Sequence, residues 1–178
     1  MDAIELAKNF ATKKFSESGV ENHFFDVYSL LRDTFETENQ KILVAGILHD
    51  VLEDTETTNE EISGNFGPEV LRLVLEVSHC KNWKDAKRPG MTKQDLMAEY
   101  YEHLKHISDE AKLIKIADFT SHLSDFIKIY QKNEQHQYPK FANNAQYVAQ
   151  IQNFLNHCAD SPAKNNLSEL ATKLKSLL

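Results

Sequence analysis

Hydrophobic residues recur at every third or fourth position along most of this chain, which is the spacing of amphipathic helices. Runs in which Val, Ile or Thr alternate with polar residues would predict strands, and they are rare here. Only 5 glycines and 4 prolines interrupt the 178 residues. The pattern therefore predicts an all-α protein.

Capping residues divide this pattern into separate helices. Thr58 stands ahead of acidic residues, as at a helix N-terminus, and Gly67 followed by Pro68 ends one helix and begins the next. Polar segments at 16–22, 81–93 and 133–139 predict loops. The expected helices cover about 2–15, a segment with Phe25, Tyr28, Leu30 and Leu31, then 39–51, a helix from 58, 68–77, 92–107, 109–130, 141–157 and 167–178.

The composition indicates one domain and excludes several classes of function. The 41% of hydrophobic residues suit a single domain over 1–178, with its core at about 1–157 and a C-terminal helix at about 167–178. A net charge of -7 argues against broad nucleic-acid binding. Without a membrane span or a signal peptide, we expect a cytoplasmic protein in which Cys80 and Cys158 are free thiols. The sequence predicts no oligomeric state.

One stretch breaks the hydrophobic pattern. His49 and Asp50 directly follow the seven apolar residues 42–48, which read as a buried helix. Burying an imidazole and a carboxylate at the end of such a helix is costly unless a partner or a metal ion compensates. Imidazole and carboxylate ligands suit Mn, Fe, Zn or Mg. The pair therefore predicts part of a metal site that needs two more ligands.

The acidic residues that follow extend this motif. Glu53 lies four residues after His49, so a continuing helix would place the two on one face. The same spacing joins Asp50 to Asp54. Alone, this acidic segment reads as a helix end followed by a turn.

Two distant positions are further candidates for residues that carry chemistry. Asp118 ends an apolar helical stripe that begins at Lys112, and His23 follows a polar loop at the start of a helix. Taken alone, each has a simpler interpretation, Asp118 as a polar residue at the edge of a buried stripe and His23 as a surface or capping residue. The adjacent His49–Asp50 pair at the end of an apolar helix is more often functional.

The order of these residues resembles the HD metal-dependent phosphohydrolase superfamily. Within it, the chain resembles the RelA/SpoT-type hydrolases, especially the stand-alone small alarmone hydrolases. The resemblance covers about residues 1–155 and is carried by 44–55, 62–74 and 112–118. It implies an all-α HD-domain helical bundle with a bound divalent ion, usually Mn²⁺. The implied ligands are His23, His49, Asp50 and Asp118.

The resemblance also implies a reaction. The family removes the 3′-pyrophosphate from the alarmone (p)ppGpp, and Glu53 and Asp54 match the acidic pair that positions and activates water. A bound metal lowers the pKa of its water and neutralises phosphate charge, and Glu53 is placed to take or relay the proton. The substrate contacts it implies are Lys13, Lys14, His122 and Tyr147. The two lysines are equally consistent with a solvated charged face.

The chain departs from the family at two places. The family usually has Asn four positions after the last ligand, where this chain has His122, and it commonly has Gly-x-Pro-Tyr before the ligand His, where this chain reads Gly19-Val20-Glu21-Asn22. Three functions stay open: a (p)ppGpp 3′-pyrophosphohydrolase, an HD phosphohydrolase for another nucleotide or phosphorylated metabolite, and a non-catalytic binding module. The complete ligand set and acidic pair favour an enzyme.

Overall fold

A computed structural model describes residues 2–19, 23–79, 90–134 and 144–178. Within these ranges every regular element is a helix, which confirms the all-α prediction. The elements are α1 Ala3–Ser18, α2 Phe24–Ser29, the π-helix η1 Leu30–Thr34, α3 Gln40–Leu48, α4 Val51–Asp54, α5 Asn59–Phe66, α6 Pro68–Val77, α8 Lys93–Leu104, α9 Asp109–Gln131, α10 Asn144–Leu155 and α11 Pro162–Lys175.

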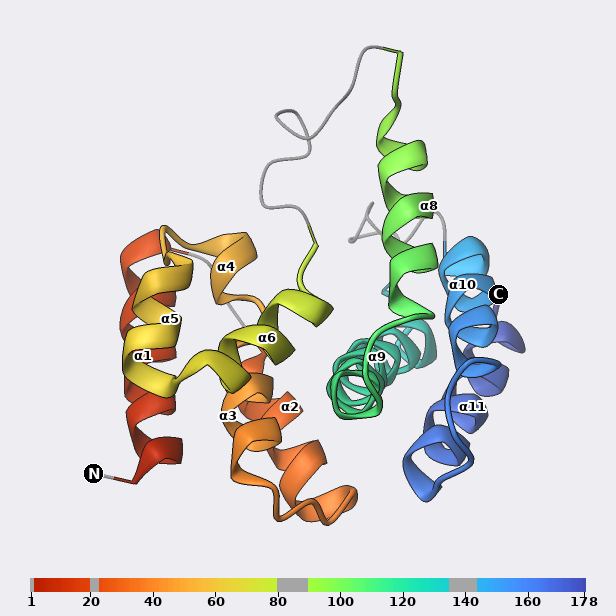
Figure 1. The fold of residues 1–178 in the computed structure, drawn as a ribbon. Coiled ribbons are helices and arrows are strands. Elements are labelled where there is room, and N and C mark those ends of the chain that lie inside the picture. The colour runs from red at the N-terminus through yellow and green to blue at the C-terminus, as the bar shows by residue number, and fades with distance from the viewer. Residues whose placement is uncertain (1, 20–22, 80–89, 135–143) are drawn as a thin grey trace.

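Helix α9 is the central element of the fold. It lies between the N-terminal helices and the pair formed by α10 and α11 (Figure 1). Helices α2, α3 and α6 pack against α9 from one side and α11 from the other. In its middle, residues 114–121 are buried, including polar side chains that an ordinary amphipathic helix would expose. Polar groups buried there need partners, and the metal centre described below includes one of them.

The apolar run 42–48 does form a buried helix, but that helix ends earlier than expected. Helix α3 stops at Leu48, His49 and Asp50 form a turn, and α4 starts at Val51. The helix does not continue through the motif, so the condition under which His49 and Glu53 would share one helical face is not met. Asp50 and Asp54 remain one turn apart, since the Asp54 amide donates to the Asp50 carbonyl at 3.0 Å.

A second difference follows His23. The expected single helix is divided into α2 and η1, and the π-helix places Leu31 against Gly46 of α3. A Cβ atom on Gly46 would lie 2.4 Å from Leu31 Cδ1, so only glycine permits this approach. Leu31 is fully buried at 0% exposure, so making room for that atom would require a shift within the core. The close packing of η1 on α3 thus depends on a missing side chain.

Local capping signals located several helix ends correctly. Thr58 forms a full capping box with Glu61, and Gly67 and Pro68 separate α5 from α6 as predicted. Residues 16–18 were expected in a loop but form the last turn of α1, which Gly19 ends with a φ of 68°. Helix α11 starts at Pro162 instead of about 167, because Ser161 caps it and proline suits its first turn.

Parts of the predicted loops 16–22, 81–93 and 133–139 lie outside the described residues, as does Cys80. Cys158 is a buried free thiol, as predicted. None of the described helices is both long enough and apolar enough to cross a membrane.

Candidate metal centre

Four side chains predicted to bind a metal come together from three parts of the chain. His23 precedes α2, His49 and Asp50 form the turn between α3 and α4, and Asp118 lies in the middle of α9. The Asp50 Oδ2 atom lies 3.0 Å from His49 Nε2 and 3.5 Å from His23 Nε2. The Asp118 Oδ1 atom lies 3.4 Å from His23 Nε2 and 3.9 Å from His49 Nε2. The structure thus brings residues far apart in sequence to one point.

Three of these donor atoms are buried without a hydrogen bond. They are His23 Nε2, His49 Nε2 and Asp118 Oδ1, which lie 3.0–3.5 Å from polar atoms of Asp50 or His122 but not with the geometry of a hydrogen bond. A buried polar atom left unsatisfied costs about 1–3 kcal/mol, so three at one point require a compensating partner. A cation that accepts all three lone pairs provides it.

The other nitrogen of each histidine is held by a neighbour. His49 Nδ1 donates to the Gly46 carbonyl at 2.9 Å, which leaves the lone pair on Nε2. His23 Nδ1 lies 3.0 Å from the Ser121 hydroxyl. Such contacts are typical of metal-ligating histidines, because they orient the ring and select its tautomer. Gly46 and Ser121 therefore support the ligand set without belonging to it.

The donor separations fit a single divalent ion. With metal–ligand bonds of about 2.1 Å, two donors stand about 3.0 Å apart at a right angle and about 4.2 Å apart when opposite. The four imidazole–carboxylate separations among these donors run from 3.0 to 3.9 Å and fall inside that window. Two imidazoles and two carboxylates suit several divalent metals. The residues present therefore fit the ion that the sequence predicted.

The charges around this point favour a positive species. Burial alone would lower the pKa of His49, but the Asp50 carboxylate outweighs it and raises that pKa to about 9. The cause is an attraction between the carboxylates and any positive charge placed among the ligands. A bound divalent ion satisfies the same attraction and displaces the imidazole proton. The site thus favours a positive charge, from a proton or a metal.

Sequence reasoning did not single out Lys115. Its ammonium lies 2.5 Å from Asp118 Oδ2 and 4.8 Å from the centre of the Phe119 ring, and the side chain is buried. Burial alone would raise the pKa of Asp118, but the Lys115 charge holds it well below its usual range. Asp118 is therefore ionised, with Oδ2 on Lys115 and Oδ1 toward the histidines. The sequence feature that could have revealed this ion pair is a lysine three residues before an aspartate within an apolar stripe.

The acidic pair borders the ligands on α4. Glu53 Oε1 accepts a hydrogen bond from the backbone amide of His79 at 2.6 Å. Burial, followed by the negative charge of Asp50, raises the pKa of Glu53 to about 7. Asp54 is more exposed, and burial and Asp50 also raise its pKa. A carboxyl group with a pKa near 7 can exchange protons at neutral pH.

The residues expected to contact a substrate fall in different places. His122 Nε2 lies 3.2 Å from Asp118 Oδ1, directly beside the ligands. Tyr147 packs against the Phe119 ring, with ring centres 5.9 Å apart. Lys14 forms a 2.6 Å ion pair with Glu61 of α5.

Lys13 lies 3.8 Å from Glu17 on the same helix, with 74% of its side chain exposed. Its neighbour Lys14 makes its ion pair with a different helix, so the two ammonium groups contact carboxylates on different helices.

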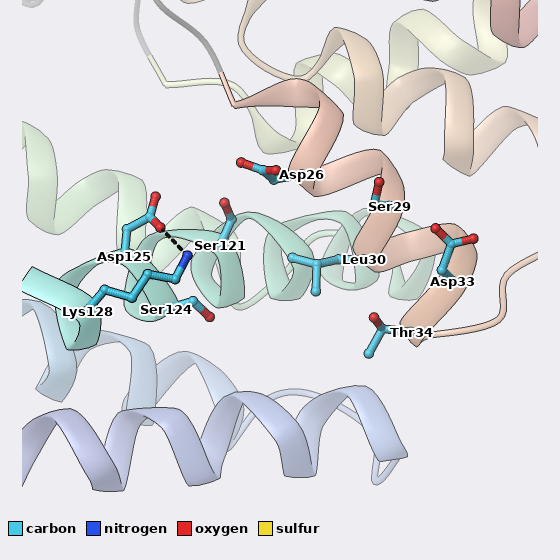
Figure 2. A pocket seen from close by; sticks show the side chains of 9 residues that line it. All are labelled: Asp26, Ser29, Leu30, Asp33, Thr34, Ser121, Ser124, Asp125 and Lys128. Carbon is cyan, nitrogen blue, oxygen red and sulfur yellow. Dashed lines mark hydrogen bonds and ion pairs between the residues drawn. The ribbon is translucent and has the colours of Figure 1, made fainter.

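A pocket of about 290 Å³ opens next to the centre, between α2, η1 and α9 (Figure 2). Ser121, which contacts His23, is part of its wall. The remaining lining residues are Asp26, Ser29, Leu30, Asp33, Thr34, Ser124, Asp125 and Lys128. Three carboxylates against one ammonium, which is itself paired with Asp125 at 2.9 Å, do not suit a phosphate group. No sequence pattern predicts this pocket, because most of its residues are ordinary polar positions on three elements.

Comparison with known proteins places these features in a family. The HD domain family matches residues 3–154. Proteins named guanosine-3′,5′-bis(diphosphate) 3′-pyrophosphohydrolase MESH1 are similar in sequence: that of Danio rerio is 36% identical over 104 residues, which cover 58% of this chain and 53% of the relative. That of Xenopus tropicalis is 35% identical over 127 residues, which cover 67% of this chain and 66% of the relative. The chain thus spans about half to two thirds of the length of these relatives.

Two solved structures share the fold. One, of a metazoan ortholog of SpoT described as hydrolysing ppGpp and playing a role in starvation responses, has a TM-score of 0.72 at 21% identity and covers 100% of this chain and 98% of its own. A crystal structure from Listeria monocytogenes has a TM-score of 0.67 at 23% identity, and it covers 87% of this chain and 97% of its own. The predicted HD-domain helical bundle is thereby confirmed. Because the family match extends over residues 3–154, this chain belongs to the HD domain family.

Proposed function

We propose that this protein is a metal-dependent phosphohydrolase that removes pyrophosphate from the 3′ position of (p)ppGpp. The observation that carries the proposal is the convergence of three buried, unsatisfied donor atoms with the Asp50 carboxylate at one point. Relatives about 35% identical are named as hydrolases of guanosine-3′,5′-bis(diphosphate), which supports the choice of substrate.

In this proposal His23, His49, Asp50 and Asp118 hold the ion, and Mn²⁺ is the ion that we propose. When bound, it activates a water molecule and neutralises phosphate charge. Glu53 accepts the proton of the attacking water, a role that its pKa of about 7 and its orientation by the His79 amide support. Asp54, on the same short helix, positions the water.

The substrate contacts are proposed more broadly. His122 borders the ligands and is placed to meet a phosphate, while Tyr147 lies behind it against aromatic side chains. To reach a ligand, Lys13 would have to leave only its 3.8 Å contact with Glu17, whereas Lys14 would have to leave its 2.6 Å ion pair with Glu61. The negative net charge supports a small-molecule substrate over nucleic acid. We propose one cytoplasmic domain over 1–178 that binds no membrane.

A related function has one observation in its favour. His122 stands where the resemblance leads one to expect Asn, next to the position where phosphate would bind. An imidazole and an amide offer different hydrogen bonds, so this change favours a different nucleotide or phosphorylated metabolite. The fold and metal chemistry would then be the same, and only the substrate would differ.

The test is a hydrolysis assay with a panel of nucleotides. Protein stripped of metal and reloaded with Mn²⁺ should release pyrophosphate and GDP from ppGpp, and Asp50→Ala should abolish the release. Asp160→Ala is the matched control, because that side chain is 96% exposed and pairs only with Lys164 among the interactions described. Turnover of other nucleotides without turnover of ppGpp would support the alternative substrate. If the protein hydrolysed no nucleotide of the panel, the proposal that it is a phosphohydrolase would be refuted.

A further inference from the structure

We propose that His122 is a fifth protein ligand of the metal, binding through Nε2 beside Asp118. The inference rests on the metal site of the proposed function and adds a residue to it. It assigns His122 a bond to the ion in place of a contact with substrate alone.

His122 lies at ligand distance from two of the four proposed ligands, His23 and Asp118. Its Nε2 atom lies 3.2 Å from Asp118 Oδ1, inside the window of about 3.0–4.2 Å expected for two donors on one ion. Its ring centre lies 4.4 Å from that of His23. The donor atoms of His23, Asp118 and His122 all lie within 4.8 Å of one another. His23 belongs equally to a second such group with His49 and Asp50, so the two groups meet at one imidazole.

The backbone holds His122 in this place. Asp118 and His122 are four residues apart on α9, so their side chains project from one face on successive turns. Lys115 fixes the other oxygen of Asp118, which directs Oδ1 toward the histidines. The position of His122 is therefore set by a long packed helix and not by a loop.

His122 also occupies a distinct side of the centre. His49 is 1% exposed and forms the buried wall, whereas the His122 side chain is 43% exposed. The open side is where water and substrate would reach the ion. An imidazole there would occupy one coordination position that solvent would otherwise fill. The proposed ligand set then consists of three imidazoles and two carboxylates.

This composition has a consequence for metal preference. Imidazole suits Zn, Cu, Fe and Ni, while carboxylate and water oxygens suit Mn and Mg, and Co²⁺ follows Mn²⁺ and Fe²⁺ in the general order of rising affinity for such sites. Replacing His122 by Asn removes one nitrogen donor from the open side. The wild-type protein should therefore bind Co²⁺ more tightly relative to Mn²⁺ than His122→Asn does.

Metal binding without substrate tests this inference directly. Competition with a fluorescent chelator would measure the affinities for Co²⁺ and Mn²⁺ of wild type, His122→Asn and His106→Asn. The control His106 is 72% exposed and lies near Glu102, so it reports on a surface histidine. Loss of even an outer contact of a ligand typically costs about 10–100-fold in affinity. We expect Co²⁺ binding to weaken at least about tenfold in His122→Asn, Mn²⁺ binding to weaken less, and the control to be unchanged.

The visible absorption spectrum of the Co²⁺ protein gives a second readout, because removing a nitrogen ligand changes its bands. An unchanged spectrum and unchanged affinities in His122→Asn, with a raised KM for the nucleotide, would overturn the inference and make His122 a substrate contact. If the protein hydrolyses no nucleotide but its Co²⁺ spectrum depends on His122, the proposed function fails and the fifth ligand stands. A melting curve in EDTA confirms that each variant is folded.

Discussion

The packing of η1 on α3 makes a sharp prediction about two glycines. Gly46 and Gly64 both lie inside helices, so alanine should favour either helix by about 1 kcal/mol. At Gly64 a new Cβ meets nothing within 4 Å, and Gly64→Ala should stabilise the protein by about 0.5–1 kcal/mol. At Gly46 the same atom would lie 2.4 Å from Leu31 Cδ1, which is far below van der Waals contact.

Leu31 cannot move away cheaply, because it is fully buried and Val27 Cγ1 lies 3.7 Å from the same Cβ position. Inserting a methyl group into a packed core typically costs about 1–3 kcal/mol. Both variants gain the same helix propensity from alanine, so the difference between their free energies of unfolding measures this packing cost alone. Gly46→Ala should therefore be less stable than Gly64→Ala by about 1–3 kcal/mol.

Urea unfolding followed by far-ultraviolet circular dichroism, with EDTA present, measures this difference without a contribution from bound metal. A second readout is metal affinity. The Gly46 carbonyl accepts a hydrogen bond from His49 Nδ1, so a shift of α3 should weaken metal binding in Gly46→Ala and leave it intact in Gly64→Ala. Equal stabilisation by both alanines would refute the reasoning, since it would mean that α3 and η1 can separate at no cost.

Three more predictions concern buried groups. Lys115→Met should lower the free energy of unfolding by about 3–5 kcal/mol in EDTA, because Asp118 loses its buried partner, and by less with Mn²⁺ present; equal losses in the two conditions would contradict this role. Glu53→Gln should lower kcat by about 10²–10⁴-fold with normal metal content, and a variant with full kcat would exclude Glu53 as the base. Burial raises the pKa of Cys158 to about 11, so folding favours its thiol form, and this contribution to stability is present below the ordinary thiol pKa and lost as pH rises toward 11. In a Cys80→Ser background, Cys158 should react with a thiol reagent at pH 8 only as the protein unfolds, and rapid labelling of the folded protein would count against its burial.

Helix positions were predictable where the signal is local. The capping box at Thr58 and the Gly67–Pro68 junction depend on residues within one turn, so the sequence alone locates them. The end of α3 was not predictable, because apolar residues continue at Val51 and Leu52 and periodicity does not mark the turn. The π-helix likewise follows from packing against Gly46, which is a contact between distant parts of the chain.

The candidate metal centre was likewise predictable only where the signal is local. His49 and Asp50 stood out because two polar groups end an apolar run, whereas His23 and Asp118 had simpler interpretations and entered through the resemblance. Their convergence depends on how α2 and α9 pack, which no spacing reveals. The ion pair between Lys115 and Asp118 was within reach of local reasoning, since a spacing of three residues on a helix places two side chains together.

The central position of α9 also orders events during synthesis. Domains generally fold as units while the chain emerges from its N-terminus. The helices α1 to α6 are made before α9, and they carry His23, His49 and Asp50 but not Asp118. A nascent chain of that length exposes the surfaces of α2, α3 and α6 that α9 later covers, and it carries only three of the four proposed metal ligands. With this ligand set, tight metal binding requires that α9 has been synthesised and has packed against the earlier helices. Metal binding would then be a late step, completed only in the fully folded domain.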